Sequence, residues 1–266
     1  MLEAVEYIGR VGVGVTSPSL IKGDDGFTYV VKMQNNRLGT KVLVNEYIAA
    51  WLGRQLELPF PFGACIRLSD EFVAQNRRRF HRRVKAGIHF ASRYLKGAKY
   101  VHYYHMPQVT NKAEFAGVIL FDHLFLNEDR TLNGKNLLIC REANGYRMQA
   151  IDNSHLFGSG RWVTENLASI KRRFRLNQRR AYGALLKRDL CGNDFACYIA
   201  RFKALDDGQI RAAMDGIPKE WGMQAADLEA IVDFIQYRRE MVERIAARII
   251  DSIPNIHRGI ERDDVK

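Results

Sequence analysis

Up to about residue 100, short apolar runs alternate with polar turn signals, a pattern typical of a small β-sheet. The runs VEYIGRVGVGV (5–15), FTYVVKM (27–33) and AGIHFASRYL (86–95) predict strands. Between the first two, GDDG (23–26) predicts a hairpin turn. One helix interrupts this pattern, because residues 41–57 carry apolar positions at helical spacing.

The ends of this helix are marked in the sequence. Thr40 precedes it as the expected N-cap, and the proline-containing LPFPFG (58–63) ends it. At 3.6 residues per turn, Glu46 lies on a face whose other members are apolar or small, namely Leu43, Ala49, Ala50 and Gly53. A lone carboxylate on such a face is expected to point at a cation, because desolvating an unpaired charge is costly.

Beyond about residue 100 the pattern becomes helical. Asn111 and Glu114 have the spacing of a capping box and predict the start of a largely apolar, buried helix over residues 112–127. A polar loop follows, and then the short apolar runs NLLIC (136–140) and YRMQAID (146–152) predict a β-hairpin.

From residue 162 onward helices dominate, and the last is predicted over residues 225–253, stopping before Pro254. Between a coiled coil and the core of a helical lobe we favour the core, because the apolar positions do not repeat as a clean heptad. The expected fold class is therefore α+β. We expect a small, mainly β N-lobe with one helix over residues 1–96 and a larger, mainly helical C-lobe over residues 97–266.

Composition is that of an ordinary globular protein. The 266 residues are 47% hydrophobic and 27% charged, which predicts a packed core. The formal net charge is +11, and much of the basic excess lies in NRRRFHRR (76–83) and KRRFRLNQRR (171–180). We interpret both runs as solvated helix or loop surface. A nucleic acid, an acidic protein or a phosphorylated partner stays open, because charge alone does not decide.

The sequence also predicts where the protein acts. No apolar run approaches the roughly 20 residues of a membrane helix. The N-terminus lacks the basic-then-apolar order of a signal peptide. The four cysteines show neither a CxxC pair nor metal-ligand spacing. We therefore expect reduced core thiols, a cytoplasmic location and no membrane partner.

Lys32 lies inside a predicted strand, where its ammonium group needs an anion. Glu46 on the following helix offers one. A strand lysine that meets a helix glutamate under a small sheet holds the α- and β-phosphates of ATP in kinase folds. A structural ion pair or a surface lysine is the alternative interpretation.

Upstream, GRVGVGVTSPSLI (9–21) combines glycines with small hydroxyl residues. Such a stretch suits the close approach of backbone N–H groups to phosphate oxygens. It matches neither GxxxxGK[ST] nor GxGxxG, so a tight β-turn is an equal alternative.

The stretch LFLNEDRTLNGKNLLI (124–139) places charged and amide residues between two apolar runs. Asp129, Asn136 and Asp152 follow one another in the order that phosphoryl transfer requires. The first acid would orient or deprotonate the attacking hydroxyl, and the amide and second acid would hold Mg²⁺ through oxygen ligands. A metal-free polar turn is the alternative. The presence of Lys32 and Glu46 upstream, also in order, favours the catalytic interpretation.

With these residues in view, the sequence resembles the HipA-like kinases, in particular short bacterial homologues that lack the extra N-terminal subdomain of HipA proper. The resemblance spans roughly residues 13 to 250, over GVTSPSLIKGDDGFTYVVK, LVNEYIAAWLG, GIHFASRYL, LNEDRTLNGKNLLI, AIDNSHLFG and, more weakly, IPKEWG. Its most specific part is AIDNSHLFG after the acid–amide loop, a pairing that also resembles phosphoinositide lipid kinases. The resemblance implies a two-lobed protein-kinase-like fold and transfer of the ATP γ-phosphate, with Mg²⁺, to a Ser or Thr hydroxyl of a protein or of the chain itself.

The resemblance implies a role for each catalytic candidate. Lys32 would contact the α- and β-phosphates, and Glu46 would brace it. Asp129 would be the catalytic acid–base. Asn136 and Asp152 would be the Mg²⁺ ligands.

It also implies nucleotide contacts. Thr16 and Ser17 would lie in the loop over the phosphates, where some relatives carry a phosphorylated serine. The strand with His89 and Phe90 would link the lobes and meet the adenine through its backbone, with Val30 of the lysine strand also at the nucleotide.

The chain departs from the family pattern in the catalytic loop. Kinases of this fold place the metal-binding Asn five residues after the catalytic Asp. Here Asn136 comes seven residues after Asp129, and Asn133 comes four after. We favour a two-residue insertion with Asn136 as the ligand, since it directly precedes the apolar LLI. Thr131 stands where the usual pattern has a histidine, which bears on catalytic efficiency.

Other functions stay open at this point. One is a pseudokinase-like module that uses its cleft or basic runs to bind a protein or nucleic acid, and another is a small-molecule or lipid kinase. Some relatives are toxins of toxin–antitoxin pairs, so a growth-control role and an antitoxin partner are expectations by analogy. The sequence does not name the protein substrate.

Overall fold

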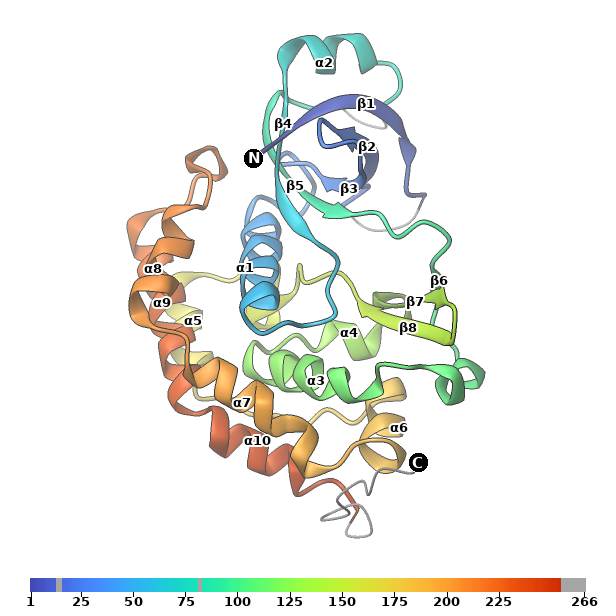
Figure 1. Ribbon diagram of the computed structural model, residues 1–266. Helices are drawn as coiled ribbons and strands as arrows, with labels where there is room; N and C mark the ends of the chain where they lie inside the picture. Colours follow the sequence, from blue (N-terminus) through green and yellow to red (C-terminus); the bar gives the residue numbers. More distant parts are fainter. Residues whose placement is uncertain (13–15, 81–82, 255–266) are drawn as a thin grey trace.

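A five-stranded barrel forms the small lobe at the top of Figure 1. The computed structural model describes residues 1–12, 16–80 and 83–254. Neighbouring strands pair in the order β1-β2-β3-β5-β4, and a short parallel pairing between β1 and β4 closes the barrel. The strands are β1 (Leu2–Arg10), β2 (Ser19–Gly23), β3 (Thr28–Lys32), β4 (Gly63–Leu68) and β5 (Gly87–Arg93).

Alternation along these strands builds the core of the barrel. One face of each strand points inward, and the buried side chains include Ile21, Tyr29, Val31, Ile66 and Ala91. The short helix α2 (Asp70–Asn76) and the turn after it cover one end with Phe72 and Phe80. The small lobe is therefore a separate hydrophobic cluster with its own core.

The predicted strands and hairpin turn are confirmed, with shifted ends. Gly23 N–H donates to the carbonyl of Phe27, and Gly26 takes φ +82, so the chain turns between β2 and β3 as expected. β1 begins earlier than predicted and ends at Arg10. Residues 13–15 of the predicted run lie outside the described residues.

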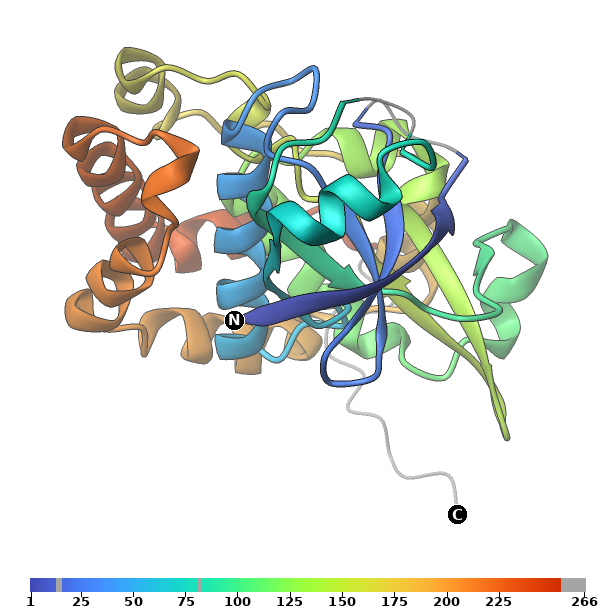
Figure 2. The ribbon, with the colours of Figure 1, turned by 90° about the horizontal axis from the view of Figure 1, so that it is seen from above.

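Helix α1 (Lys41–Gln55) connects the barrel to the rest of the protein. Seen from above, it lies between the barrel and helices α8 (Asp207–Asp215) and α9 (Ala225–Glu240) (Figure 2). The helix is confirmed, and Thr40 occupies its N-cap position as predicted. Its side chain makes no capping hydrogen bond, however, because its Oγ1 donates to the carbonyl of Trp221 at 2.6 Å.

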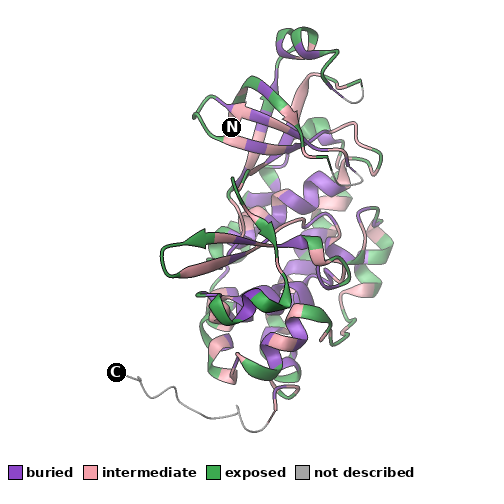
Figure 3. Ribbon diagram, turned by 90° about the vertical axis from the view of Figure 1, so that its right-hand side faces the viewer, coloured by how far each residue is buried: buried purple, intermediate pink, exposed green. Residues whose placement is uncertain are grey.

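The large lobe combines helices with a three-stranded sheet, ordered β6-β7-β8. Its strands are β6 (Lys99–Tyr100), β7 (Leu137–Glu142) and β8 (Gly145–Ala150), which form the predicted hairpin and one added strand. The remaining helices are α3 (Phe115–Leu124), α4 (Asp129–Leu132), α5 (Thr164–Ile170), α6 (Arg180–Arg188), α7 (Ala196–Lys203) and α10 (Val242–Ile250). Every residue of α3 is buried, as its apolar sequence predicted. Figure 3 shows burial concentrated in the central helices, whereas the outer end of the β7–β8 hairpin is exposed.

Three other expectations need adjustment. Asn111 occupies the N-cap of a 3₁₀ turn over Lys112–Glu114 that leads into α3, but it makes no capping hydrogen bond, because its side chain bonds the N–H and the carbonyl of Met148 on β8 and the Glu114 carboxylate. The predicted terminal helix breaks at Met241 into α9 and α10, which pack in the helical lobe as expected. The four cysteines are free; Cys65 packs against the core while partly exposed, and Cys197 is exposed, so not all four are core thiols.

The chain crosses from the barrel to the lower sheet between Arg93 and Lys99, and this segment runs down the right side of Figure 1. The boundary expected between residues 96 and 97 falls inside this crossing. Within the described ranges, none of the helices has the length and apolar character that a bilayer crossing requires.

Candidate active site

A cleft of about 590 Å³ lies where the barrel meets the large lobe. Val30 and Lys32 of β3 and Phe90 of β5 line it from the barrel side. Asn136 and Asp152 line it from the large lobe. The structure therefore brings together, at one cleft, residues that are more than a hundred positions apart in the sequence.

An ionic cluster joins the two lobes at this cleft. Lys32 Nζ pairs with Glu46 Oε1 of α1 and lies 2.8 Å from Asp152 Oδ1. The expectation that Glu46 points at a cation is confirmed. Glu46 Oε1 also accepts a hydrogen bond from the backbone N–H of Asn153 at 3.2 Å, so one carboxylate orients both the lysine and the segment after β8.

The charges in this cluster do not balance. Burial opposes the charged form of Lys32, but the Asp152 and Glu46 carboxylates overcome it and raise the pKa of Lys32 well above its ordinary value. Burial also opposes the charged form of Asp152, yet Lys32 and Ser154 hold the pKa of Asp152 well below its usual range. Burial raises the pKa of Glu46. With all three groups charged, one cation faces two anions, which leaves negative charge beside the cleft.

Asp152 is held by its backbone as well as by its partners. Its φ of +62 lies in the left-handed region, which costs free energy for a residue with a Cβ and is found where function fixes a conformation. Its Oδ1 accepts hydrogen bonds from the hydroxyl (2.5 Å) and the N–H (3.3 Å) of Ser154. The carboxylate is therefore fixed against Lys32.

The loop after α3 returns Asn136 to Asp129. α4 begins at Asp129, and the backbone N–H of Asn133 donates to the Asp129 carbonyl at 2.7 Å. A 3₁₀ turn over Gly134–Asn136 follows, and Asn136 Nδ2 then donates to Asp129 Oδ2 at 2.7 Å. Two consecutive turns thus accommodate the seven-residue spacing.

The two asparagines of this loop have different surroundings. Asn136 is buried, and its Nδ2 is used by Asp129, which leaves its Oδ1 as an oxygen donor. Its carbonyl accepts from the N–H of Ile151 at 3.0 Å, which places Asn136 beside the segment that carries Asp152. Asn133 Oδ1 instead accepts from the N–H of Lys135 at 3.1 Å. The geometry favours Asn136 as the metal ligand.

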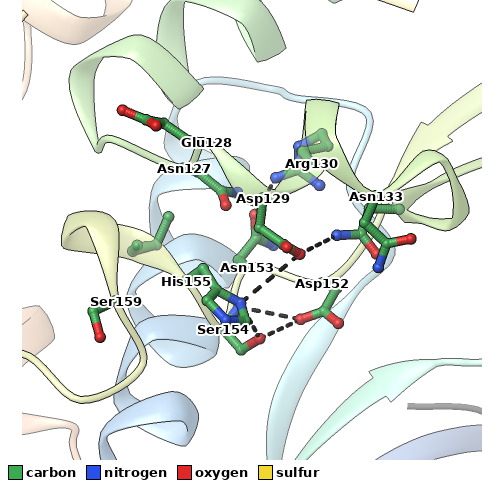
Figure 4. A network of polar contacts seen from close by, with 12 residues as sticks. Asn127, Glu128, Asp129, Arg130, Asn133, Asp152, Asn153, Ser154, His155 and Ser159 are labelled. Carbon is green, nitrogen blue, oxygen red and sulfur yellow. Dashed lines mark hydrogen bonds and ion pairs between the residues drawn. The ribbon is translucent and has the colours of Figure 1, made fainter. Parts of the chain in front are cut away.

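Two residues after Asp152 complete the polar network. Figure 4 shows Ser154 and His155 facing the carboxylates of Asp152 and Asp129, respectively. His155 Nδ1 lies 3.8 Å from Asp129 Oδ2. Both residues lie within AIDNSHLFG, but the sequence analysis assigned them no role. Their position directly after Asp152 was the available signal that they belong to the site.

A second ionic cluster, formed by Arg130, Asp122 and Tyr182, stabilises the loop that carries Asp129. The fully buried Arg130 forms two hydrogen bonds to Asp122 of α3, at 2.7 and 3.2 Å, and its Nη1 donates to the carbonyl of Ile151 at 2.6 Å. Tyr182 of α6 donates its hydroxyl to Asp122 at 2.5 Å. Burial opposes the charge of Arg130, but Asp122 raises its pKa. This cluster fixes the position of the neighbouring Asp129 relative to the strand before Asp152.

Thr131 also holds the loop. Its hydroxyl donates to the carbonyl of Glu128 at 3.1 Å and accepts from the side-chain amide of Asn177. The backbone N–H of Asn177 donates to His123 Nε2 at 3.0 Å. These contacts give Thr131 a supporting role in the geometry of the loop.

The two phosphate-loop candidates share one small cavity, but only Thr16 also reaches the cleft. Thr16 is buried and lines both the cleft and this small cavity. Ser17, with φ +50, lines the small cavity and not the cleft. Residues 13–15 of the glycine-rich stretch lie outside the described residues.

His89 is another predicted nucleotide-binding residue that the structure places away from the cleft. Its ring is buried in the barrel, where Nδ1 accepts from the N–H of Gln34 at 2.9 Å and Nε2 lies 3.2 Å from the Lys85 carbonyl. Burial lowers the pKa of His89 to about 4. His89 therefore does not line the cleft, because it points to the opposite face of β5 from Phe90.

The end of the predicted lobe-linking strand (residues 89–95) borders the cleft. Its last residues Arg93, Tyr94 and Leu95 line the cleft, together with Ala98 just beyond it. The sequence indicated this segment but singled out none of these four residues; their place at the end of the strand that links the lobes was the available signal.

The donor set fits a nucleoside triphosphate and a hard divalent cation. Asn136 and Asp152 offer oxygen atoms, which such cations prefer, and the unbalanced negative charge beside them favours a cation. Lys32 supplies the positive charge for phosphate oxygens at the same place. The volume of the cleft suits a ligand of this size.

Three features together define a protein-kinase-like fold. They are the barrel, the helix α1 that supplies Glu46 to the strand residue Lys32, and the acids Asp129 and Asp152 of the large lobe. Sequence comparison identifies the branch: a family model described as HipA-like kinase matches residues 4–249. The chain belongs to the HipA-like kinase family, and this membership supports a kinase function. No curated protein sequence matches the chain.

The solved structure of a kinase, CtkA, supports the fold. CtkA, a Helicobacter pylori proinflammatory kinase, aligns with a TM-score of 0.60 and 14% identity over 94% of this chain and 96% of that chain. The Golgi casein kinase with Mn and ADP bound aligns with a TM-score of 0.49 and 10% identity, over 94% of this chain and 72% of that chain. At 14% identity, the likeness to CtkA shows a shared fold and nothing finer.

Proposed function

We propose that the chain is an ATP- and Mg²⁺-dependent protein kinase that phosphorylates a Ser or Thr hydroxyl of a protein or of itself. The observation that carries this proposal is the contact of Lys32 with both Glu46 and Asp152 at the cleft, next to the Asp129–Asn136 pair. Each group stands where phosphoryl transfer requires a charge or an oxygen donor.

The residues of the chain divide the work as follows. Lys32 neutralises charge on the phosphates, and Glu46 keeps its ammonium group oriented. Asn136 and Asp152 would hold Mg²⁺, which would supply positive charge to the transferring phosphoryl group. Val30 and Phe90, with the crossing segment, offer the apolar walls for a base.

Asp129 orients the attacking hydroxyl and accepts its proton. The Nδ2 of Asn136 fixes one carboxylate oxygen of Asp129 at 2.7 Å, and His155 approaches the same oxygen at 3.8 Å. The other oxygen remains for the substrate hydroxyl.

The proposal is tested by incubating the purified chain with Mg²⁺ and γ-labelled ATP, with and without cell lysate. We expect label on protein serine or threonine in the wild type and its loss in Asp129→Asn. Asp215→Asn, at an exposed position on α8, is the matched control and should keep full activity. Label that persists in Asp129→Asn would overturn the assignment of Asp129.

The main alternative is a pseudokinase-like module that binds a partner through its basic surface. If no label transfers, binding to nucleic acid is measured over a range of salt concentrations, because phosphate contacts make such affinity fall steeply with salt. A flat response would exclude a nucleic-acid partner. A phosphorylated small molecule or lipid in place of labelled protein would instead assign the chain to small-molecule or lipid kinases.

A cytoplasmic growth-control role, with an antitoxin as partner, belongs to the same proposal by family analogy. Expression of the wild type should then arrest growth, whereas Asp129→Asn should not. A small helix-turn-helix protein encoded next to this chain and able to reverse the arrest would support the pair; growth arrest by both variants would contradict it.

A further inference from the structure

Arg238 on α9 is a buried cation without a carboxylate partner among the described residues. Only 1% of the residue is exposed. Its Nη2 donates to the carbonyls of Ile170 (3.3 Å) and Arg173 (2.6 Å), and its Nε has no hydrogen-bond partner. Burial lowers the pKa of this guanidinium to about 10. Arg130, which is equally buried, is neutralised by Asp122, so the charge of Arg238 stands out as uncompensated.

A cavity of about 230 Å³ lies beside Arg238, between the segment after α5 and helices α9 and α10. Its lining within the described part of the chain includes no aspartate or glutamate. The basic residues that line it are Lys171, Arg172, Arg238, Arg244 and Arg248. So many like charges around one cavity repel one another unless an anion lies between them.

Neighbouring groups orient these cations. The guanidinium of Arg248 lies 5.1 Å from the ring centre of Phe174, and Lys171 Nζ lies 5.3 Å from that of Tyr237. Lys171 also pairs with the exposed Asp233 at 2.7 Å, outside the cavity lining. The arginines therefore supply the charge that is free to meet a ligand.

We propose that this cavity binds the phosphate group of a phosphomonoester, with Arg238 at its buried wall and Arg244 and Arg248 at its rim. A dianionic phosphate offers three acceptor oxygens, and guanidinium groups match them with paired N–H donors. The enclosed volume suits one phosphate with its ester arm. The inference stands apart from the proposed phosphoryl transfer, since none of these residues lines the cleft.

The arrangement of the basic run favours a compact monoester over a nucleic-acid strand. Lys171 and Arg172 line the cavity, but Arg173 and Arg175 turn to Glu128, at 3.4 and 3.5 Å. Glu128 therefore offsets part of the positive charge next to the cavity, which makes this part of the run less suited to follow a sugar–phosphate backbone. Glu128 is the residue before Asp129, so a bound phosphate would stabilise a segment that contacts the loop carrying Asp129.

The test is calorimetric titration of the intact chain with N-acetyl-O-phosphoserine amide and with glycerol 3-phosphate. These probes present the same monoester as a protein side chain and as a free small molecule. We expect saturable binding of at least one probe, and the tighter one identifies the source. Arg244→Ala with Arg248→Ala should weaken it at least about tenfold, since two charge-assisted hydrogen-bond donors are lost.

The matched control is Arg77→Ala with Arg78→Ala, which removes two exposed arginines from the other basic run. It should change the affinity less than about twofold, because long-range charge effects are screened. The exposed pair 244/248 is chosen because replacing the buried Arg238 could disturb folding. Absence of saturable binding, equal weakening in both double variants, or tighter binding of an oligothymidylate in this cavity would overturn the proposal.

Discussion

Two buried ionic clusters meet at the segment around Asp152, since Arg130 donates to the carbonyl of Ile151, and they differ in their balance of charge. Lys32 faces two carboxylates, and the side chain of Asp152 is still 34% exposed to the cleft. Arg130 faces one carboxylate, Asp122, and both side chains are almost fully enclosed. The first cluster is open and unbalanced; the second is closed and neutral.

This difference in charge balance indicates that the Lys32 cluster serves the proposed reaction, whereas the Arg130 cluster stabilises the fold. A closed pair with all of its hydrogen bonds made gains nothing from a ligand, and its removal leaves an unpaired buried charge. An open cluster with surplus negative charge can receive a cation and a phosphate without rearranging. The two clusters should therefore respond in opposite ways to the loss of one member.

The largest expected effect is on activity, in the open cluster. Asp152→Asn should lower phosphoryl transfer on the order of 10³-fold, because an anionic metal ligand is lost. The free energy of unfolding should change by no more than about 1 kcal/mol, since Lys32 keeps Glu46. Labelled-ATP transfer and urea unfolding measure the two quantities. Retained transfer, or a large loss of stability, would contradict the role given to this cluster.

In the closed cluster, the loss of one member should lower stability strongly. Arg130→Met leaves Asp122 buried and without its cation, which should lower the free energy of unfolding by roughly 3–5 kcal/mol in urea titrations. Adding Asp122→Leu should recover a large part of this loss, because no charge then remains buried. A single variant as stable as the wild type would show that Arg130 does not support the fold.

Within the catalytic loop, Asn136→Ala should lower transfer on the order of 10²-fold, with a rise in the Mg²⁺ concentration needed for half-maximal rate. Asn133→Ala is the matched control and should change the rate less than about threefold. Asn133 also lines the cleft, but among the described residues its side chain hydrogen-bonds the backbone of its own turn and not Asp129 or Asp152. Equal losses in both variants, measured at limiting Mg²⁺, would show that the loop spacing has been read wrongly.

The smallest effect concerns acid stability. The pKa of His89 is about 4 in the folded state and about 6.5 when unfolded, so the unfolded chain binds the proton more readily. This contribution to stability is complete above pH 6.5 and is lost as the pH falls toward 4. Between pH 7 and 5 the loss is about 2 kcal/mol. His89→Gln should flatten this dependence in urea titrations at several pH values; an unchanged slope would assign it to other groups.

The sequence predicted those parts of the site that depend on local periodicity and order. The helical face of Glu46 indicated a cation, and Lys32 is that cation. The order of Asp129, Asn136 and Asp152 predicted residues that the structure brings together, with Asn136 and Asp152 lining the cleft and Asp129 bonded to Asn136. These features need only an element type and a direction along the chain.

What the sequence missed depends on the choice of partner in three dimensions. Alternation shows that His89 and Phe90 point to opposite faces of β5, but only the pairing of Phe90 with Lys32 shows which face borders the cleft. Thr40 and Asn111 have the chemistry of helix caps, yet distant backbone groups bind their side chains. The apolar pattern continues through Met241, so it could not predict the break there.

The pairing of β1 with β4 bears on how a protein substrate of the proposed kinase would reach the cleft. An unpaired strand edge is a surface on which an extended peptide adds as a further strand, and on which copies of a protein aggregate. The pairs Leu2–Ile66 and Glu3–Arg67 close the described strands of the barrel and shorten the edge that β1 and β4 offer. We therefore expect side chains at the mouth of the cleft, more than main-chain pairing with the barrel, to determine substrate specificity.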